Sequence, residues 1–429
     1  MTDRIRELLE KNKEGIISLG RRLFENPELG YKEFTTRELL LDYIKEIELT
    51  GFEAYAVTGF KATIGKGKPH IALLFDMDGL PTKGHRLASN EDLAAHSCGH
   101  NAQMALMSAA FKVIAESGLL QEDGGTVSLI AAPAEEFVDF EYRKNLIKER
   151  KIKTFSGKQN MLSAGAFDDI DLVIGSHGNG LPGAVIETGT ASNGFVAKTA
   201  IFKGVSAHSG AYPHLGRNAL NAAILAIQAV GLLRETFQDD HHIRFHPVIK
   251  EGGDAVNTVP HRVKVETYVR GSTVESIRDA NERINNAFIH SALAMGCECE
   301  IEDIPGYLPS NYFEGLDTYF HKRALEYVDE NDLLTGGRTF ASDDIADVSN
   351  LKPVLHFGFS GFGGSYHGAD FHILDEEKAY VEPAKLVALT VADILKDKDK
   401  LKEKLVAFRP TMTKEAYVNN WLGLKQEGS

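Results

Sequence analysis

The stretch IALLFDMDGLP, residues 71–81, decides the fold class. Five apolar residues run together and end at two carboxylates, Asp76 and Asp78. A run this short, continuously apolar and followed by a turn, is typical of a strand that is buried on both faces. Three further runs share these features: 127–133, 171–176 and 354–359. Patterns typical of helices precede the first run, at 2–24 and 34–47, and follow it at 101–117, with Gly118 as a helix stop. The sequence therefore predicts an α/β domain with a mostly parallel central sheet.

The middle of the chain has a different pattern. Strand-like alternation and helical spacing follow each other in the order β-α-β-β-α-β, which is typical of a ferredoxin-like α+β unit. The elements are expected at 195–203, 216–237, 242–249, 261–270, 274–294 and 297–304. We therefore expect a domain at 195–311 inserted into a larger one formed by 1–194 and 312–429. The charged segment 138–158 is expected to be surface structure.

Composition restricts the partners. The 47 basic and 61 acidic side chains leave a net charge of −14, which argues against a nucleic-acid partner. The chain has no continuous apolar run of the ~18 residues that a membrane span needs. Three cysteines cannot form a disulfide framework in 429 residues, and the N-terminus has no leader pattern. We expect a cytoplasmic protein without a membrane partner.

Metal-binding residue types follow the predicted strands. One of them comes directly after each of three strands: Asp78, the pair Glu135-Glu136, and His177. His367 follows the last strand, and Cys98-x-His100 opens the helix that follows the first one. The carboxyl ends of parallel strands meet at one edge of a sheet. Taken alone, a cysteine is usually a small buried hydrophobe, a histidine at a strand end is mostly structural, and paired glutamates often only face solvent. Their coincidence at one edge favours a site for divalent metals, in which a thiolate can bridge two cations.

Several motifs resemble one known family. They are 26-NPELG-30, 74-LFDMDGLP-81, 96-HSCGHN-101, 133-PAEE-136, Ser206-Ala-His208 with Pro213, 257-NTVP-260 with Arg270, Ser342-Asp-Asp344, and His367 with Phe371. Together they resemble peptidase family M20, in particular its amidohydrolase subfamily, over nearly the whole chain. Where that subfamily commonly has Asp and His, this chain has Asn101 and Gln103. Neither position is expected to bind metal.

The resemblance implies a zinc-peptidase-like catalytic domain and a ferredoxin-like lid that forms a homodimer. It implies two divalent metal ions per chain, zinc or manganese. The implied ligands are Cys98 as the bridge, with His100, Glu136, His177 and His367. Glu135 would be the general base that activates a metal-bound water, and Asp78 would orient a ligand.

The resemblance also implies roles outside the metal ligands. His208 would stabilise the oxyanion, across the dimer, although an ordinary loop histidine is the alternative. Asn257 and Arg270 would bind the substrate carboxylate, although a strand-end salt bridge explains Arg270 nearly as well. Backbone amides around Gly363 would approach an anion, or 361–364 is only a turn.

We therefore expect an amidohydrolase that cleaves small N-acyl or N-aroyl amino acids, with aminobenzoyl-glutamate as one candidate. The alternatives are a dipeptidase or aminopeptidase of the same family, and a non-catalytic metal-binding regulatory protein. The acyl group and the amino acid side chain stay open, because specificity lies in loops that no local rule decodes.

Overall fold

The computed structural model describes residues 1–179 and 185–423 and divides into two compact units. The first unit consists of Met1–Ala191, Asn311–Arg338 and Asp347–Lys414. The second consists of Ser192–Ser310, Thr339–Ala346 and the described part of 415–429. The segments 339–346 and 415–423 thus pack with the second unit, whereas the sequence pattern assigned them to the first.

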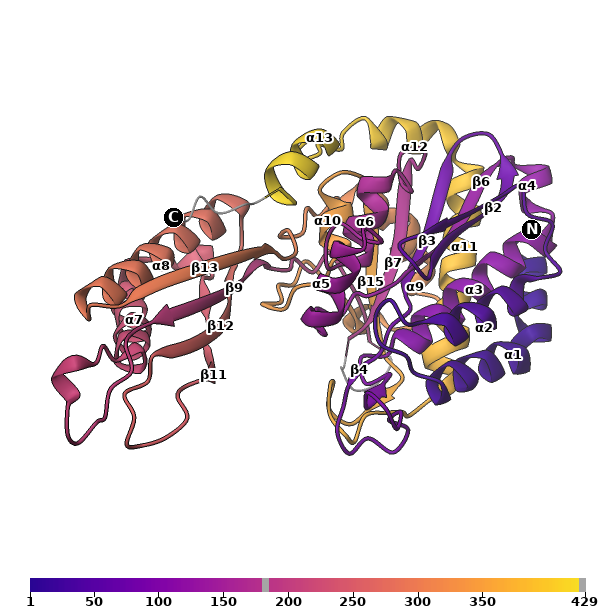
Figure 1. Ribbon diagram of the computed structural model, residues 1–429. Coiled ribbons are helices and arrows are strands. Elements are labelled where there is room, and N and C mark those ends of the chain that lie inside the picture. The colour runs from indigo at the N-terminus through magenta and orange to yellow at the C-terminus, as the bar shows by residue number, and fades with distance from the viewer. Residues whose placement is uncertain (180–184, 424–429) are drawn as a thin grey trace. The chain divides into compact units, whose positions relative to one another are not determined.

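A large mixed sheet forms the centre of the first unit (Figure 1). Its strands among the described residues follow the order β1-β2-β6-β3-β7-β15-β8-β14. The four central strands, β6, β3, β7 and β15, are parallel to one another, and every residue of β3 and β6 is buried. This confirms the prediction of a mostly parallel sheet with buried central strands. The bounds are β1 Gly51–Tyr55, β2 Gly59–Lys66, β3 His70–Asp76, β6 Gly125–Ala132, β7 Leu172–Gly178, β8 Ile186–Thr188, β14 Leu333–Thr335 and β15 Val354–Phe359.

Helix α3, His100–Ser117, packs between α1, Thr2–Glu25, and α11, Glu382–Lys396 (Figure 1). Nearly all of its side chains are buried, and Gly118 ends it in the left-handed conformation, as predicted. Gly99 precedes it with φ +82°, and a Cβ there would lie 3.1 Å from the Phe362 ring. Other helices of the first unit are α2 Phe34–Ile44, α4 Leu119–Glu122, α5 Phe140–Lys148, α6 Gly157–Ala164, α9 Asp317–Ala324 and α12 Lys398–Leu405. Helices α10, Ile345–Ser349, and α13, Lys414–Ala416, each span a boundary between segments of the two units.

The segment 138–158 is surface structure only in part, since 147–151 are exposed, as expected, whereas 155–158 are buried. It forms α5 and the start of α6, and α6 packs against β6 and β1. Arg143 and Lys158 are 0% and 1% exposed, and the Lys158 ammonium pairs with the Asp76 carboxylate at the end of β3. The charge of Lys158 is thus neutralised inside the protein, while Lys148, Glu149 and other charged residues of the segment face solvent.

The second unit has the predicted ferredoxin-like topology (Figure 1). Its antiparallel sheet has the order β13-β9-β12, with β10 and β11 both along β12, and α7 and α8 pack together on it. The strand expected at 242–249 is divided into β10 and β11, because Pro247 lies between them and has no N–H for a ladder bond. The bounds are β9 Gly194–Lys203, α7 Ala219–Leu233, β10 Arg244–Phe245, β11 Val248–Glu251, β12 Arg262–Gly271, α8 Val274–Ala294 and β13 Glu298–Pro305.

Among the described residues, no helix combines the length and the apolar character that crossing a membrane requires.

Candidate metal centre

The metal-binding residue types meet at the carboxyl edge of the parallel strands of the first unit. Asp78 follows β3, Glu135 and Glu136 follow β6, and His177 is the sixth residue of β7. Cys98 and His100 lie at the start of α3, and His367 follows β15 along the chain. The structure therefore brings together all five residues that were expected to bind metal.

Their ligand atoms form two groups that share one thiol. Cys98, His100 and His177 make one group, and Cys98, Glu136 and His367 make the other, with the ligand atoms of each group within 4.8 Å of one another. Cys98 Sγ lies 3.5 Å from His177 Nε2 and 3.3 Å from His367 Nε2, which is 3.5 Å from Glu136 Oε1. Glu135 Oε2 lies 3.8 Å from His100 Nε2. The cysteine is at the junction, where a bridging ligand would be.

The histidine rings are oriented by backbone carbonyls. His100 Nδ1 lies 2.8 Å from the Asp78 carbonyl oxygen, and His177 Nδ1 lies 2.8 Å from that of Gly178. A proton on each Nδ1 leaves Nε2 as the metal-binding nitrogen. His100 Nε2 is buried and has no hydrogen-bond partner among the residues that the structure describes. An orphaned nitrogen beside a thiol and carboxylates fits a divalent cation.

The charge of the centre also fits a cation. Burial raises the pKa of Glu136 to about 7. Burial opposes the charged form of His100, but its hydrogen bond to Asp78 and the surrounding carboxylates raise the pKa of His100 to about 9. Burial would also raise the pKa of Asp78, yet the hydrogen bond and charge of His100 lower it overall. Burial thus disfavours a charged Glu136 in the metal-free protein, and a divalent cation in contact with it would favour the charged form.

Side chains bind the backbone of the turn that bears Glu135 and Glu136. The two oxygens of Asp78 accept hydrogen bonds from the backbone N–H groups of Glu135 and Glu136 at 3.1 and 3.0 Å. Glu33 accepts from the N–H of Ala134 at 2.9 Å, and Arg143 donates to the carbonyl of Glu136 at 2.5 Å. Sequence reasoning selected Asp78 but missed Glu33 and Arg143. Glu33 lies just beyond the 26–30 motif, and no rule of sequence spacing predicts that Arg143 lies beside the site.

Asn101 and Gln103 have structural contacts. Asn101 donates to the Gly20 carbonyl and to the Tyr380 hydroxyl, and Gln103 accepts from the N–H of Asp76. Both are buried. These contacts agree with the expectation that neither side chain binds metal.

Three predicted site residues belong to the second unit. His208 and Asn257 lie on adjoining exposed loops, linked by the backbone hydrogen bond from Ser209 to Asn257 at 3.0 Å. Arg270 near the end of β12 lies over the Phe195 and Tyr268 rings, donates to Ser342 Oγ at 2.8 Å, and burial lowers its pKa. Gly363 lies in the first unit, in β16, Phe362–Gly363, which pairs with β17, His372–Ile373.

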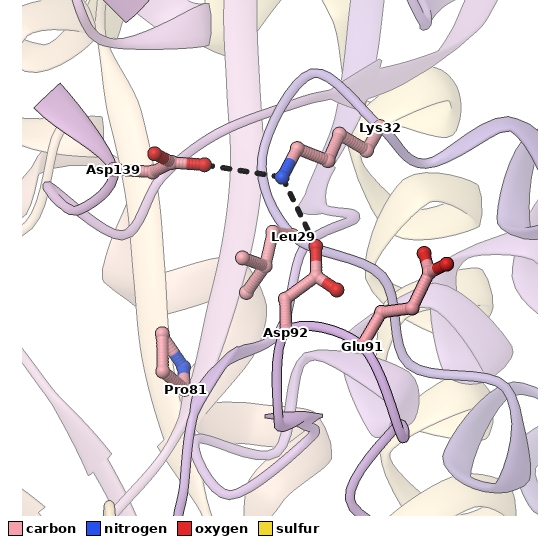
Figure 2. A pocket seen from close by; sticks show the side chains of 6 residues that line it. All are labelled: Leu29, Lys32, Pro81, Glu91, Asp92 and Asp139. Atoms are coloured by element: carbon pink, nitrogen blue, oxygen red, sulfur yellow. Dashed lines mark hydrogen bonds and ion pairs between the residues drawn. The ribbon is translucent and has the colours of Figure 1, made fainter. Parts of the chain in front are cut away.

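A pocket of about 490 Å³ adjoins the loops that carry Asp78 and Glu136 (Figure 2). Lys32 extends into it between two carboxylates, with Nζ 3.0 Å from Asp92 Oδ2 and 3.1 Å from Asp139 Oδ2. The other lining residues are Leu29, Pro81 and Glu91. Three of its lining residues, Lys32, Asp92 and Asp139, are thus paired with one another.

Comparison with known proteins agrees with this geometry. Residues 190–294 match the M20 peptidase dimerisation domain. The Xaa-Arg dipeptidase of Homo sapiens is 24% identical over 96% of this chain and 93% of its own length. One of the subunits of the p-aminobenzoyl-glutamate hydrolase of Escherichia coli is 27% identical over 75% of this chain and 62% of its own length.

A solved structure shares the fold. The Bacillus subtilis YXEP protein, described as a dinuclear metal binding peptidase from the M20 family, superposes with a TM-score of 0.67 at 20% identity, over 91% of this chain and 99% of that protein. The resemblance to peptidase family M20 is therefore confirmed. The relatives are named hydrolases and peptidases, as the expectation of an enzyme requires.

Proposed function

We propose that this chain, a relative of the M20 peptidases, is a dinuclear metal-dependent amidohydrolase that cleaves small N-acyl or N-aroyl amino acids. One observation carries the proposal: the candidate ligands form two groups that share Cys98. The name of the Escherichia coli relative makes aminobenzoyl-glutamate-like compounds the first substrates to test.

In this proposal Cys98, His100 and His177 would hold one metal ion, and Cys98, Glu136 and His367 would hold the other. Imidazole and thiolate ligands suit zinc, and the carboxylate also admits manganese. Divalent cations held in this way lower the pKa of water and polarise a carbonyl oxygen.

Side chains of the protein would transfer the proton and position the reacting groups. Glu135 takes the proton of the attacking water and returns it to the leaving amine, for which its position 3.8 Å from His100 Nε2 is suitable. Asp78 orients His100 and the turn that carries both glutamates.

The second unit would complete the site as a lid. We propose that His208 donates to the oxyanion, that Asn257 and Arg270 bind the substrate carboxylate, and that backbone amides near Gly363 contact the anion. Among the described residues Arg270 donates to a serine hydroxyl and forms no ion pair with the strand-end carboxylate that the alternative interpretation requires.

We also propose a homodimer formed through the second unit. Its α7 exposes large apolar side chains, with Leu232 at 78% exposure and Ile224 and Leu225 also exposed. A second copy would cover this surface. Because Cys98, Cys297 and Cys299 form no disulfide among the described residues, we propose the cytoplasm as the place of action.

A dipeptidase is the second candidate, because the human Xaa-Arg dipeptidase aligns with 96% of this chain. A panel of aminobenzoyl-glutamate, N-acetyl amino acids, indole-acetyl amino acids and Xaa-Arg dipeptides separates the two. Preference for blocked amines supports the amidohydrolase, and preference for free α-amines supports the dipeptidase.

The general base is tested by Glu135→Gln. We expect the variant to keep its metal and to lose about 100-fold or more in kcat, because the amide cannot accept the proton. Metal content by mass spectrometry and kcat on the best substrate of the panel are the measurements. An unchanged kcat would remove Glu135 from this role.

A further inference from the structure

Buried ionisable side chains hold the backbone turn Ala134–Glu136 at its N–H groups and at its last carbonyl. Ala134 has φ +54°, a left-handed conformation that an alanine rarely adopts, so the surrounding contacts must maintain it. Asp78 binds the N–H groups of Glu135 and Glu136. Two side chains that no motif singled out, Glu33 and Arg143, bind the remaining N–H and the last carbonyl.

Glu33 is fixed at both carboxyl oxygens. Oε1 accepts from the N–H of Ala134 at 2.9 Å, and Oε2 accepts from the Thr58 hydroxyl at 2.5 Å. The side chain is 0% exposed, so both oxygens depend on these contacts rather than on water. Glu33, the residue before α2, is therefore bound to Ala134, the residue before the proposed general base.

Arg143 supports the other end of the turn. Nη2 donates to the carbonyl of Glu136, Nη1 donates to the carbonyl of Phe155 at 2.9 Å, and the guanidinium lies 5.5 Å from the centre of the Tyr31 ring. Arg143 is also 0% exposed.

Glycine at position 30 leaves room for both partners. A Cβ there would approach Arg143 Nη2 to 2.6 Å and Ala134 Cα to 2.7 Å. A larger residue would push the guanidinium or the turn away. The 26–30 motif thus ends at the glycine beside which Arg143 and the Ala134–Glu136 turn come together.

We infer that Glu33 and Arg143 are positioning residues, which fix the Ala134–Glu136 turn and so direct Glu135 and Glu136 toward the metal centre. The inference rests on the proposed function for its chemical consequence. Its structural part, that these two side chains fix the turn, does not need a metal ion. Positioning matters here because small displacements of a catalytic group or ligand cost much of the rate or affinity.

Three variants and one control test the inference. Glu33→Ala removes the acceptor for the Ala134 N–H, and Glu33→Gln keeps an acceptor oxygen in nearly the same shape. Arg143→Met removes the donors. The control is Arg323→Met, since Arg323 is also buried in the first unit but donates to Asp393 and Glu326, away from the turn.

The first readout is amide hydrogen exchange across 132–138 in the metal-free protein. We expect exchange at 134–136 to rise by about 10-fold or more in Glu33→Ala and Arg143→Met, and to stay at the wild-type rate in Glu33→Gln and Arg323→Met. If Glu33→Ala does not fold, Thr58→Val, which removes only the hydroxyl on Glu33, should give a smaller rise in the same segment. Unchanged protection at 134–136 in variants that fold would overturn the inference.

The second readout is zinc affinity, measured with zinc alone. We expect a loss of about 10–100-fold in Glu33→Ala and Arg143→Met, and wild-type affinity in Glu33→Gln and in the control. A wild-type protein that binds no zinc contradicts the proposed function, while the exchange result still decides whether the turn is fixed by these residues. Equal zinc losses in Arg143→Met and Arg323→Met would contradict the positioning role.

Discussion

At the scale of single residues, Cys98 determines what the centre can be. An imidazole nitrogen binds one metal ion, whereas a thiolate sulfur can bind two, and Cys98 Sγ lies in contact distance of both His177 and His367. The burial of the thiol among carboxylates and imidazoles disfavours its use as a free nucleophile and favours its use as a ligand.

Asp317, at the start of α9, provides a pH-dependent test of stability. Burial raises its pKa to about 6, above the value of about 4 in an unfolded chain. The folded protein therefore holds the proton more tightly, so this carboxyl stabilises the fold most below about pH 4 and its contribution is lost as the pH rises to about 6.

In Asp317→Asn this dependence should disappear. Relative to wild type, the free energy of unfolding of the variant should rise by about 2 kcal/mol between about pH 4 and pH 7, as measured by urea denaturation. Asp329→Asn is the control, because Asp329 is exposed on the same region of the chain. Parallel pH profiles for wild type and Asp317→Asn would contradict the assignment.

At the scale of elements, α6 is attached to the central sheet by a buried ion pair. The side chains of Lys158 and Asp76 are 1% and 5% exposed. Lys158→Met should destabilise the protein by about 3 kcal/mol or more, because it leaves a buried carboxylate without its counter-charge. Adding Asp76→Asn should restore part of that loss.

The matched control for this pair is Lys151→Met on the same segment. Lys151 and its partner Glu149 are both more than half exposed, and we expect no measurable change in the denaturation midpoint. A Lys158→Met variant as stable as Lys151→Met would show that the buried pair does not hold α6.

Elements with a strong period were predictable from the sequence. The apolar run at 71–75 lies within β3, and α8 and β15 have the predicted bounds. The candidate ligands could also be predicted, because parallel strands bring their carboxyl ends together. The role of 138–158 could not, since a charged segment looks the same whether its charges meet water or buried partners. Glu33 and Arg143 could not be predicted either, because their partners are backbone groups, which no pattern of side chains indicates.

At the scale of the whole molecule, a dimer would let one subunit complete the site of the other. His208→Ala and Glu135→Gln should each be inactive as homodimers. If His208 acts across the dimer, a hybrid of the two variants contains one complete site. Co-expression with random pairing should then restore about a quarter of the wild-type activity. Hybrids as inactive as the two parents would contradict action across the dimer.

The metal stoichiometry tests the central claim most directly. After reconstitution with zinc and removal of free ion, mass spectrometry of the native protein should find two metal ions per chain in the wild type, and at most one in Cys98→Ala. A wild-type protein without metal, or a Cys98→Ala variant that keeps full occupancy, would contradict a dinuclear centre bridged by this thiolate.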